Sequence, residues 1–203
     1  MPISSKRWES YPWKNELQLQ MERAIAHGLE VLDDDFQGDH SPLDMMERAI
    51  VLSAFAIRRM VEKKLVTDAF AASKRSVRSF KAVSAAEFRP PFHGDSGGSA
   101  FSNYHFAMPV MIDMTTGELA NEIIHSSQLM VVDGEAFAAD GFLIASDWHL
   151  SRRVLHLSFA EFEGFVRSVL RDDVAYMSDQ WNPETGRVSS ARLGPSELSK
   201  LKR

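Results

Sequence analysis

Three polar side chains that could take part in chemistry recur at helical spacing between residues 118 and 125. Glu118, Asn121 and His125 stand three and four positions apart, so on an α-helix their side chains lie on one face. A histidine beside an amide can bind a phosphate, position a base, or form hydrogen bonds across a helix interface. The face is therefore either a functional site or a polar seam between helices or subunits, and both interpretations stay open.

Two arginines of an upstream helix are the candidate cations for this face. Arg48 and Arg58 lie off the apolar side of the helix that we predict from residue 42 onward. Arginine is rarely buried without a partner, so solvated charge is the alternative to a role in the site. Together with Glu118, Asn121 and His125 they form the first candidate functional face.

A second group of polar and aromatic residues crowds one turn, SDWHLSRR, from Ser146 to Arg153. Its candidate site residues are Asp147, Trp148, His149 and Arg152. Arginine and tryptophan together can contact a phosphate or stack on a base. The alternative is a plain polar hairpin tip, because connections run over the surface of a protein.

The stretch ANEIIH, residues 120–125, resembles the motif of the HEPN superfamily of small helical bundles. That motif is an arginine, a polar residue that is often asparagine, three variable residues and a histidine. Asn121 and His125 match the polar and histidine positions, and Ala120 stands where the family has arginine. The wider pattern, ERAIVLSAFAIRRMVEKKL, NEIIHS and GFLIASD, resembles a set of bacterial proteins of no assigned function over about residues 47–157.

The HEPN resemblance implies a dimeric ribonuclease of toxin–antitoxin or phage-defence systems, or a non-catalytic member that binds RNA, nucleotides or protein partners. The nuclease chemistry needs a cation on the phosphate and a histidine for proton transfer or positioning. With Ala120 in the arginine position, that cation would have to come from Arg48, Arg58 or the adjacent Arg59 of the second helix. We therefore expect a non-enzymatic, soluble interaction protein, accessory to a bacterial stress or defence system. The alternative is a HEPN-like ribonuclease or RNA-binding protein that uses His125 and Asn121.

Composition argues against several other classes of function. The 203 residues carry a formal net charge of −5, which argues against a globally basic nucleic-acid binder. There is no cysteine, so disulfides, thiolate metal sites and a cysteine nucleophile are excluded. The seven histidines show no HxH, HxxxH or HExxH spacing, so we expect no metal and no cofactor. GDSGG, residues 94–98, is like a serine-protease motif, but the chain before it is mainly helical in pattern, unlike that fold.

The sequence also bears on location and assembly. No run of about 18 apolar residues is present, so we expect no membrane span. The first residues, MPISSKRWESYPWKNEL, are too polar for a signal peptide. We expect a cytoplasmic protein that forms a homodimer, with a protein partner or RNA as further candidates for binding.

Capping residues and apolar periodicity predict the elements that must hold these side chains. The helices expected are Asn15–Asp33, Pro42–Leu65, Thr116–Gln128 and Phe159–Arg171. The strands expected are an edge strand within residues 74–87 and an antiparallel meander of Leu129–Asp133, Phe142–Asp147 and Arg153–Leu157.

The predicted fold class is α+β: mainly a helical bundle with a small antiparallel sheet near the C-terminus. Residues 1–180 are expected to form a single domain, which begins with an irregular arm around Trp8, Tyr11 and Trp13. Beyond it, residues 181–203 are polar, and we expect a loosely ordered tail.

Overall fold

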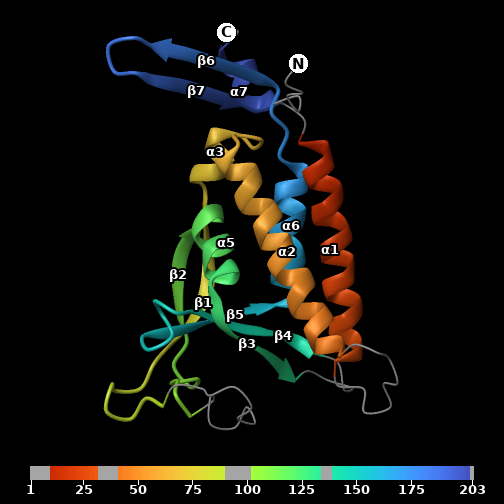
Figure 1. Ribbon diagram of the computed structural model, residues 1–203, viewed down its shortest axis with the longest axis vertical. Helices are drawn as coiled ribbons and strands as arrows, with labels where there is room; N and C mark the ends of the chain where they lie inside the picture. Colours follow the sequence, from red (N-terminus) through yellow and green to blue (C-terminus); the bar gives the residue numbers. More distant parts are fainter. Residues whose placement is uncertain (1–9, 32–40, 90–101, 134–138, 202–203) are drawn as a thin grey trace, which may run out of the picture.

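A five-stranded antiparallel sheet forms one layer of the fold (Figure 1). The computed structural model describes residues 10–31, 41–89, 102–133 and 139–201. The order of the strands in the sheet is β2-β1-β5-β4-β3. The strands are β1 (Lys74–Lys81), β2 (Val110–Thr115), β3 (Ser126–Asp133), β4 (Ala139–Ser146) and β5 (Arg153–Ser158). All four neighbouring pairs are antiparallel.

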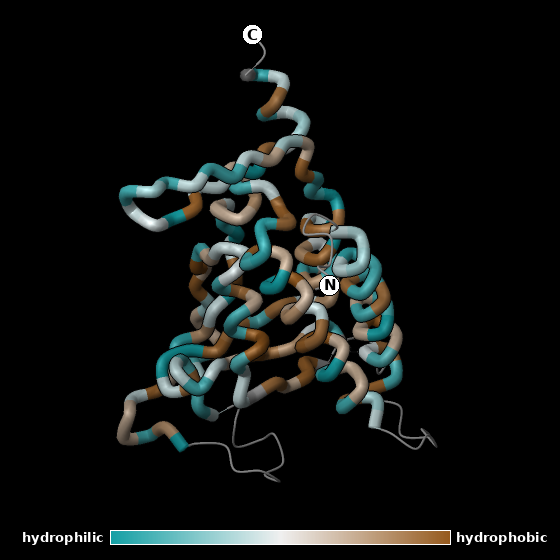
Figure 2. The backbone as a smooth tube through the Cα atoms, turned by 45° about the horizontal axis from the view of Figure 1, so that its top comes forward, coloured by the Kyte–Doolittle hydropathy of each residue, from teal (hydrophilic) through white to brown (hydrophobic). Residues whose placement is uncertain are grey.

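Helices cover one side of this sheet (Figure 1). They are α1 (Tyr11–Glu30), α2 (Pro42–Glu62), α5 (Thr116–Ile124) and α6 (Phe159–Arg171). The short α3 (Asp68–Ala72) lies beyond the end of the sheet (Figure 1) and contacts α5. The long α1 packs along α2 and also contacts α6, while α5 packs on α2. Apolar and polar residues alternate along the helices (Figure 2), as expected for helices that each bury one side. In the part of the chain that the structure describes, no helix is long and apolar enough to cross a membrane.

The helix starts that the sequence predicted are confirmed at two capping boxes. Thr115 Oγ1 accepts the Glu118 N–H, and the Glu118 carboxylate accepts the Thr115 N–H. Ser158 and Glu161 exchange the same pair of hydrogen bonds. The predicted α6, Phe159–Arg171, has the observed bounds. Each box satisfies backbone donors that a helix start leaves free.

Other predicted helix bounds were wrong. The helix that was expected to run from residue 116 to Gln128 ends at Ile124, and β3 begins at Ser126. Tyr11 and Trp13 belong to α1, not to an irregular arm. Trp8 and Asp33 lie outside the described residues.

The expected helical bundle with a small C-terminal sheet is corrected by the position of β1. This strand pairs with β2 on one side and with β5 on the other, so it is a central strand and not an edge strand. Its cations have partners inside the fold: Arg75 lies over the Phe165 ring, and Arg78 contacts His156. The α+β class is confirmed, but the sheet is a main element of the body.

A buried histidine in the middle of the sheet has a lowered pKa. Arg78 Nη1 donates a hydrogen bond to His156 Nδ1 at 3.1 Å. Burial lowers the pKa of His156 most, the charge of Arg78 lowers it further, and Glu161 and Asp140 oppose both effects. Folding therefore keeps this imidazole neutral at pH values where the unfolded chain binds a proton.

We expect the protein to lose stability as the pH falls below about 6.5, the pKa of an unperturbed histidine. In that range the unfolded state binds more protons than the folded state, so the free energy of unfolding decreases with decreasing pH. Urea unfolding between about pH 8 and about pH 5 measures this slope. His156→Gln should flatten it, whereas replacing the exposed His105 by glutamine should not. Equal slopes in all three proteins would contradict the assignment.

The last described residues form a hairpin and a helix at one end of the molecule (Figure 1). Strands β6 (Tyr176–Asn182) and β7 (Arg187–Leu193) pair antiparallel, and α7 (Pro195–Leu201) follows. This differs from the tail expected for residues 181–203. The polar composition of these residues suggested a tail. The sequence pattern does not reveal that a buried arginine attaches the hairpin to the rest of the protein.

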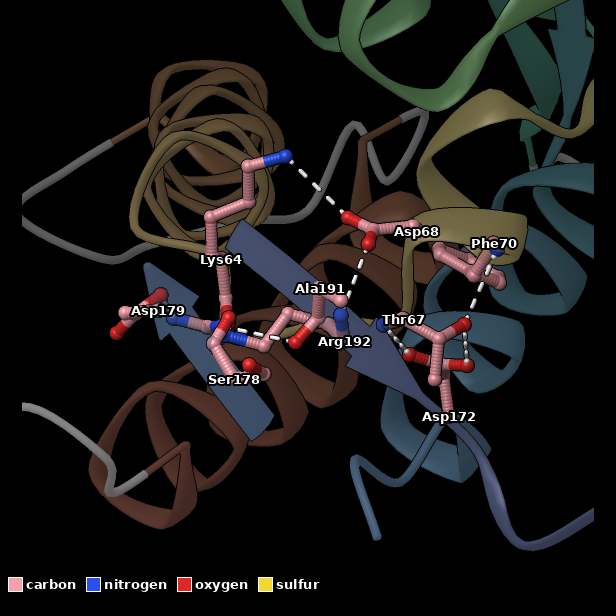
Figure 3. A network of polar contacts seen from close by, with 9 residues as sticks. All are labelled: Lys64, Thr67, Asp68, Phe70, Asp172, Ser178, Asp179, Ala191 and Arg192. Carbon is pink, nitrogen blue, oxygen red and sulfur yellow. Dashed lines mark hydrogen bonds and ion pairs between the residues drawn. The ribbon is translucent and has the colours of Figure 1, made fainter. Parts of the chain in front are cut away.

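Arg192 fastens this hairpin to the body (Figure 3). Its Nη2 pairs with Asp179 at 2.9 Å within the hairpin, and its Nε donates to the Lys64 carbonyl oxygen at 3.2 Å. Its backbone N–H donates to the Asp68 carboxylate at 2.8 Å. Nearby, the Asp172 carboxylate accepts hydrogen bonds from the Thr67 N–H and hydroxyl. The attachment is therefore polar and depends on few side chains.

Candidate functional site

The two candidate groups that the sequence suggested separately form one surface. His125 is the residue that caps the C-terminus of α5, and the turn after β4 packs back on it. The Asp147 N–H donates to the His125 carbonyl oxygen at 3.4 Å, and the rings of His125 and Trp148 lie 4.9 Å apart. The face on α5 and the turn 147–152 are therefore neighbours in space.

A pocket of about 350 Å³ opens between α5, β2 and this turn. We call it the Glu122 pocket. Of the predicted candidates, Glu118, Asn121, Trp148 and His149 line it. Its polar and charged wall also includes Asp113, Glu122, Ser146 and Arg153.

Glu122 is the central group of this pocket. Its side chain is 6% exposed, and its Oε1 lies 2.5 Å from His149 Nδ1 and accepts from Arg153 Nη2 at 3.0 Å. Glu122 Oε2 and Arg153 Nε are buried and have no hydrogen-bond partner in the described part of the chain. Because a buried carboxylate is costly unless it is paired on both oxygens, this side chain is typical of a site and not of a packing position.

Ser146, His149 and Glu122 lie together but do not form a catalytic triad. Ser146 Oγ lies 3.1 Å from His149 Nδ1, and Glu122 Oε1 meets the same nitrogen. In a triad the serine and the acid contact opposite nitrogens of the imidazole, so that one nitrogen takes the serine proton while the acid orients the ring. Here both contacts fix the position of the ring. Among the described residues, no group of three or more histidine, aspartate or glutamate side chains could hold a metal ion.

Arg58 reaches His125, while Arg48 does not reach the site. Arg58 Nη1 donates to His125 Nε2 at 3.3 Å, and its Nε pairs with Glu62 at 2.7 Å. Arg48 is exposed and stands ten positions earlier on α2, about 15 Å along the axis. Ala120, at the arginine position of the HEPN-like motif, is fully buried, so a side chain at that position faces the core and not the pocket.

The residues of the turn 147–152 contribute unequally to the Glu122 pocket. Trp148 is 65% exposed and stands at the pocket. Arg152 is exposed and uses its backbone: its N–H donates to the His149 carbonyl oxygen, and its own carbonyl oxygen accepts the Ala82 N–H. Its side chain does not line the pocket. Asp147 is also exposed and contacts the site through its N–H.

Sequence reasoning missed Glu122, and it placed Arg153 in the crowded turn without choosing it as a site residue. A signal for Glu122 was present, because it stands beside Leu119 and Ile123 on the buried side of α5, where glutamate is rare. No local pattern identifies its partner, since Arg153 follows 31 positions later.

The electrostatics of the pocket are negative. The hydrogen bonds from the Thr115 N–H and then from its hydroxyl lower the pKa of Glu118, so this carboxylate is charged at neutral pH. Asp113 and Glu122 add two further carboxylates, against one guanidinium, that of Arg153, and one imidazole, that of His149.

Comparison with known proteins assigns no family to this site. No family model, no curated protein and no solved structure matches the chain.

Proposed function

We propose that this protein is a non-enzymatic binding protein whose Glu122 pocket takes a small planar cation. The observation that carries the proposal is the Glu122 carboxylate, buried in the wall with one oxygen that has no hydrogen-bond partner among the described residues. An amidinium or guanidinium group presents two parallel N–H donors, which match the two oxygens of a carboxylate. Because Glu122 Oε2 has almost no accessible surface, such a ligand reaches it by displacing the partly exposed side chain of His149 or Arg153.

The rest of the wall favours the same class of ligand. Asp113 and Glu118 raise the negative potential, which attracts a cation. Trp148 places an exposed indole at the pocket, and an indole face attracts cations and stacks on planar groups. The two contacts on His149 Nδ1 hold the imidazole still, which suits recognition more than proton transfer.

Benzamidine, a planar aromatic cation, tests the proposal in an NMR titration of the ¹⁵N-labelled protein. We expect it to shift the resonances of residues 113, 118–122 and 146–153, and we expect benzamide, its neutral analogue, to leave them unchanged. Trp148→Ala should remove a cation–π contact of about 1 kcal/mol, or roughly fivefold in Kd. Trp181→Ala is the matched control, because Trp181 is 63% exposed on β6, outside the pocket.

Two results would contradict this function. One is benzamide binding as tightly as benzamidine, which would remove the role of charge. The other is equal loss of affinity in the Trp148 and Trp181 variants, which would place the ligand elsewhere.

A second candidate, RNA binding, is favoured by one observation. The guanidinium of Arg58, the exposed ring of His125 and the indole of Trp148 follow one another on the surface. Such a row can contact a phosphate and stack on a base. Fluorescence anisotropy with a labelled single-stranded RNA tests it: binding that is lost in both Arg58→Ala and His125→Ala would support it. The nearby carboxylates of Glu62 and Glu118 oppose phosphate, which is why we place this function second.

A further inference from the structure

A second pocket, of about 240 Å³, lies where β1 and β5 separate beneath α6. We call it the Arg75 pocket. The ladder between the two strands runs from Arg78 opposite His156 to Lys81 opposite Arg153. β1 also includes the residues before Arg78, and β5 includes those after His156. These parts of the two strands are not paired with each other. The opening is walled by β1, β5, α5 and α6.

Arg75 brings a positive charge into this pocket and forms no ion pair with a described carboxylate. Its Nη2 donates to Ser168 Oγ at 3.0 Å, and its guanidinium lies 4.4 Å from the centre of the Phe165 ring. Within the described chain no carboxylate lies within ion-pair distance of Arg75, whereas Arg153 and Arg192 each have one. Burial lowers the pKa of Arg75, but arginine stays charged in proteins. The half-buried cation therefore has unused donors.

Gly164 on α6 keeps one side of the pocket free of side chains. A Cβ atom built on it would meet no atom within 4 Å, so no neighbour requires glycine there. A glycine inside a helix costs about 0.5–1 kcal/mol relative to alanine. Neither packing nor backbone conformation therefore explains why residue 164 is glycine. An open pocket explains it, because a larger side chain would narrow the pocket.

We propose that the Arg75 pocket binds a small organic monocarboxylate. The carboxylate would accept two parallel N–H groups from Arg75, and the apolar part of the ligand would lie against Val77, Leu119 and Leu157. The volume is ample, since an engineered apolar cavity of about 150 Å³ binds benzene. This site shares no residue with the Glu122 pocket, and the proposal does not depend on the one made for that pocket.

The charge of the pocket favours a monoanion over a phosphate ester. Glu161 stands at the pocket, and its Oε2 accepts hydrogen bonds from the Ser158 N–H and hydroxyl. The carboxylate of Glu161 repels a second negative charge, so one guanidinium balances a carboxylate better than a phosphate dianion.

Benzoate is the test ligand, because its ring has the size of benzene and its amide, benzamide, is a neutral analogue. In the ¹⁵N NMR titration we expect benzoate to shift residues 75–77, 157 and 161–165, and benzamide to leave them unchanged. Phenyl phosphate should bind more weakly than benzoate. Benzamidine should shift the Glu122 pocket and not these residues, so each proposal can fail without the other.

Three variants locate the bound carboxylate. Arg75→Gln should weaken benzoate binding at least tenfold, and Gly164→Leu should weaken it by narrowing the pocket without removing a charge. Arg167→Gln is the matched control, since Arg167 is exposed on α6 and paired with Glu163. If Arg75→Gln does not fold, Gly164→Leu decides, because no atom lies near its Cβ.

The proposal is overturned by any of three outcomes. The first is that about 10 mM benzoate changes no chemical shift at these residues, because a Kd above that concentration is too weak for a specific site. The second is equal binding of benzamide. The third is a benzoate affinity that neither Arg75→Gln nor Gly164→Leu changes.

Discussion

Glu122→Ala is expected to destabilise the protein by about 2–3 kcal/mol and to abolish benzamidine binding. The substitution removes the acceptor for Arg153 and the charged partner of His149, and hydrogen bonds to charged groups contribute about 1.5–3 kcal/mol. Breaking a fully buried ion pair costs about 3–5 kcal/mol. The cost is smaller here because the side chains of His149 and Arg153 are 34% and 28% exposed, so water can solvate them in part.

Urea unfolding measures the stability change, and Glu122→Gln separates charge from shape. Glutamine keeps an acceptor oxygen, so it should cost less stability than alanine, yet still lose the attraction for a cation. Glu163→Ala is the control on α6, where an exposed pair with Arg167 contributes at most about 1 kcal/mol. A Glu122→Ala protein as stable as the parent would mean that the buried carboxylate has no net role in folding. Unchanged benzamidine affinity would remove the basis of the proposed function.

The parts of the fold that the sequence predicted well are those whose signals lie within a few residues. The Thr115–Glu118 and Ser158–Glu161 boxes are each complete within four residues, so they mark helix starts without any tertiary information. The meander of β3, β4 and β5 is confirmed for the same reason, because its strands follow one another in sequence.

The parts that the sequence did not reveal depend on partners far away along the chain. The pairing of β1 with β5 joins residues more than seventy positions apart, and no alternation within residues 74–87 shows whether a strand will be central or at an edge. The end of α5 was misjudged because His125 and Gln128 continue the helical spacing of the polar face beyond Ile124, and local spacing does not show where a strand takes over.

The candidate site, too, could be predicted only where its residues lie close together in the sequence. Glu118 and Asn121 were found by their helical spacing, and Trp148 and His149 by their crowding in one turn. That the two groups adjoin follows from the packing of β4 against α5, which no local pattern encodes. The expected homodimer and the expected stress or defence role stay predictions.

Arg192→Ala is expected to free the C-terminal hairpin while the five-stranded sheet stays folded. An isolated two-stranded hairpin is marginally stable in water, and this one depends on a guanidinium that is 5% exposed. Removing it leaves the Lys64 and Ser178 carbonyl oxygens and the Asp179 carboxylate without that donor. Truncating one partner of a buried pair costs about 3–5 kcal/mol, so we expect a loss of about 3 kcal/mol in the stability of the hairpin against local opening.

Hydrogen exchange resolved by residue measures this loss directly, because amides in a locally opening unit exchange at the rate set by that unit. The amides of β6 and β7 should exchange roughly a hundredfold faster, since each 1.4 kcal/mol is a factor of ten, while those of β4 and β5 should not change. Arg187→Ala, an exposed position on the same strand, is the control and should leave the hairpin protected. Equal acceleration in the hairpin and the sheet would show that they unfold as one unit. The prediction that the domain ends at residue 180 would then be wrong, because β7 lies after that residue and would unfold together with the sheet.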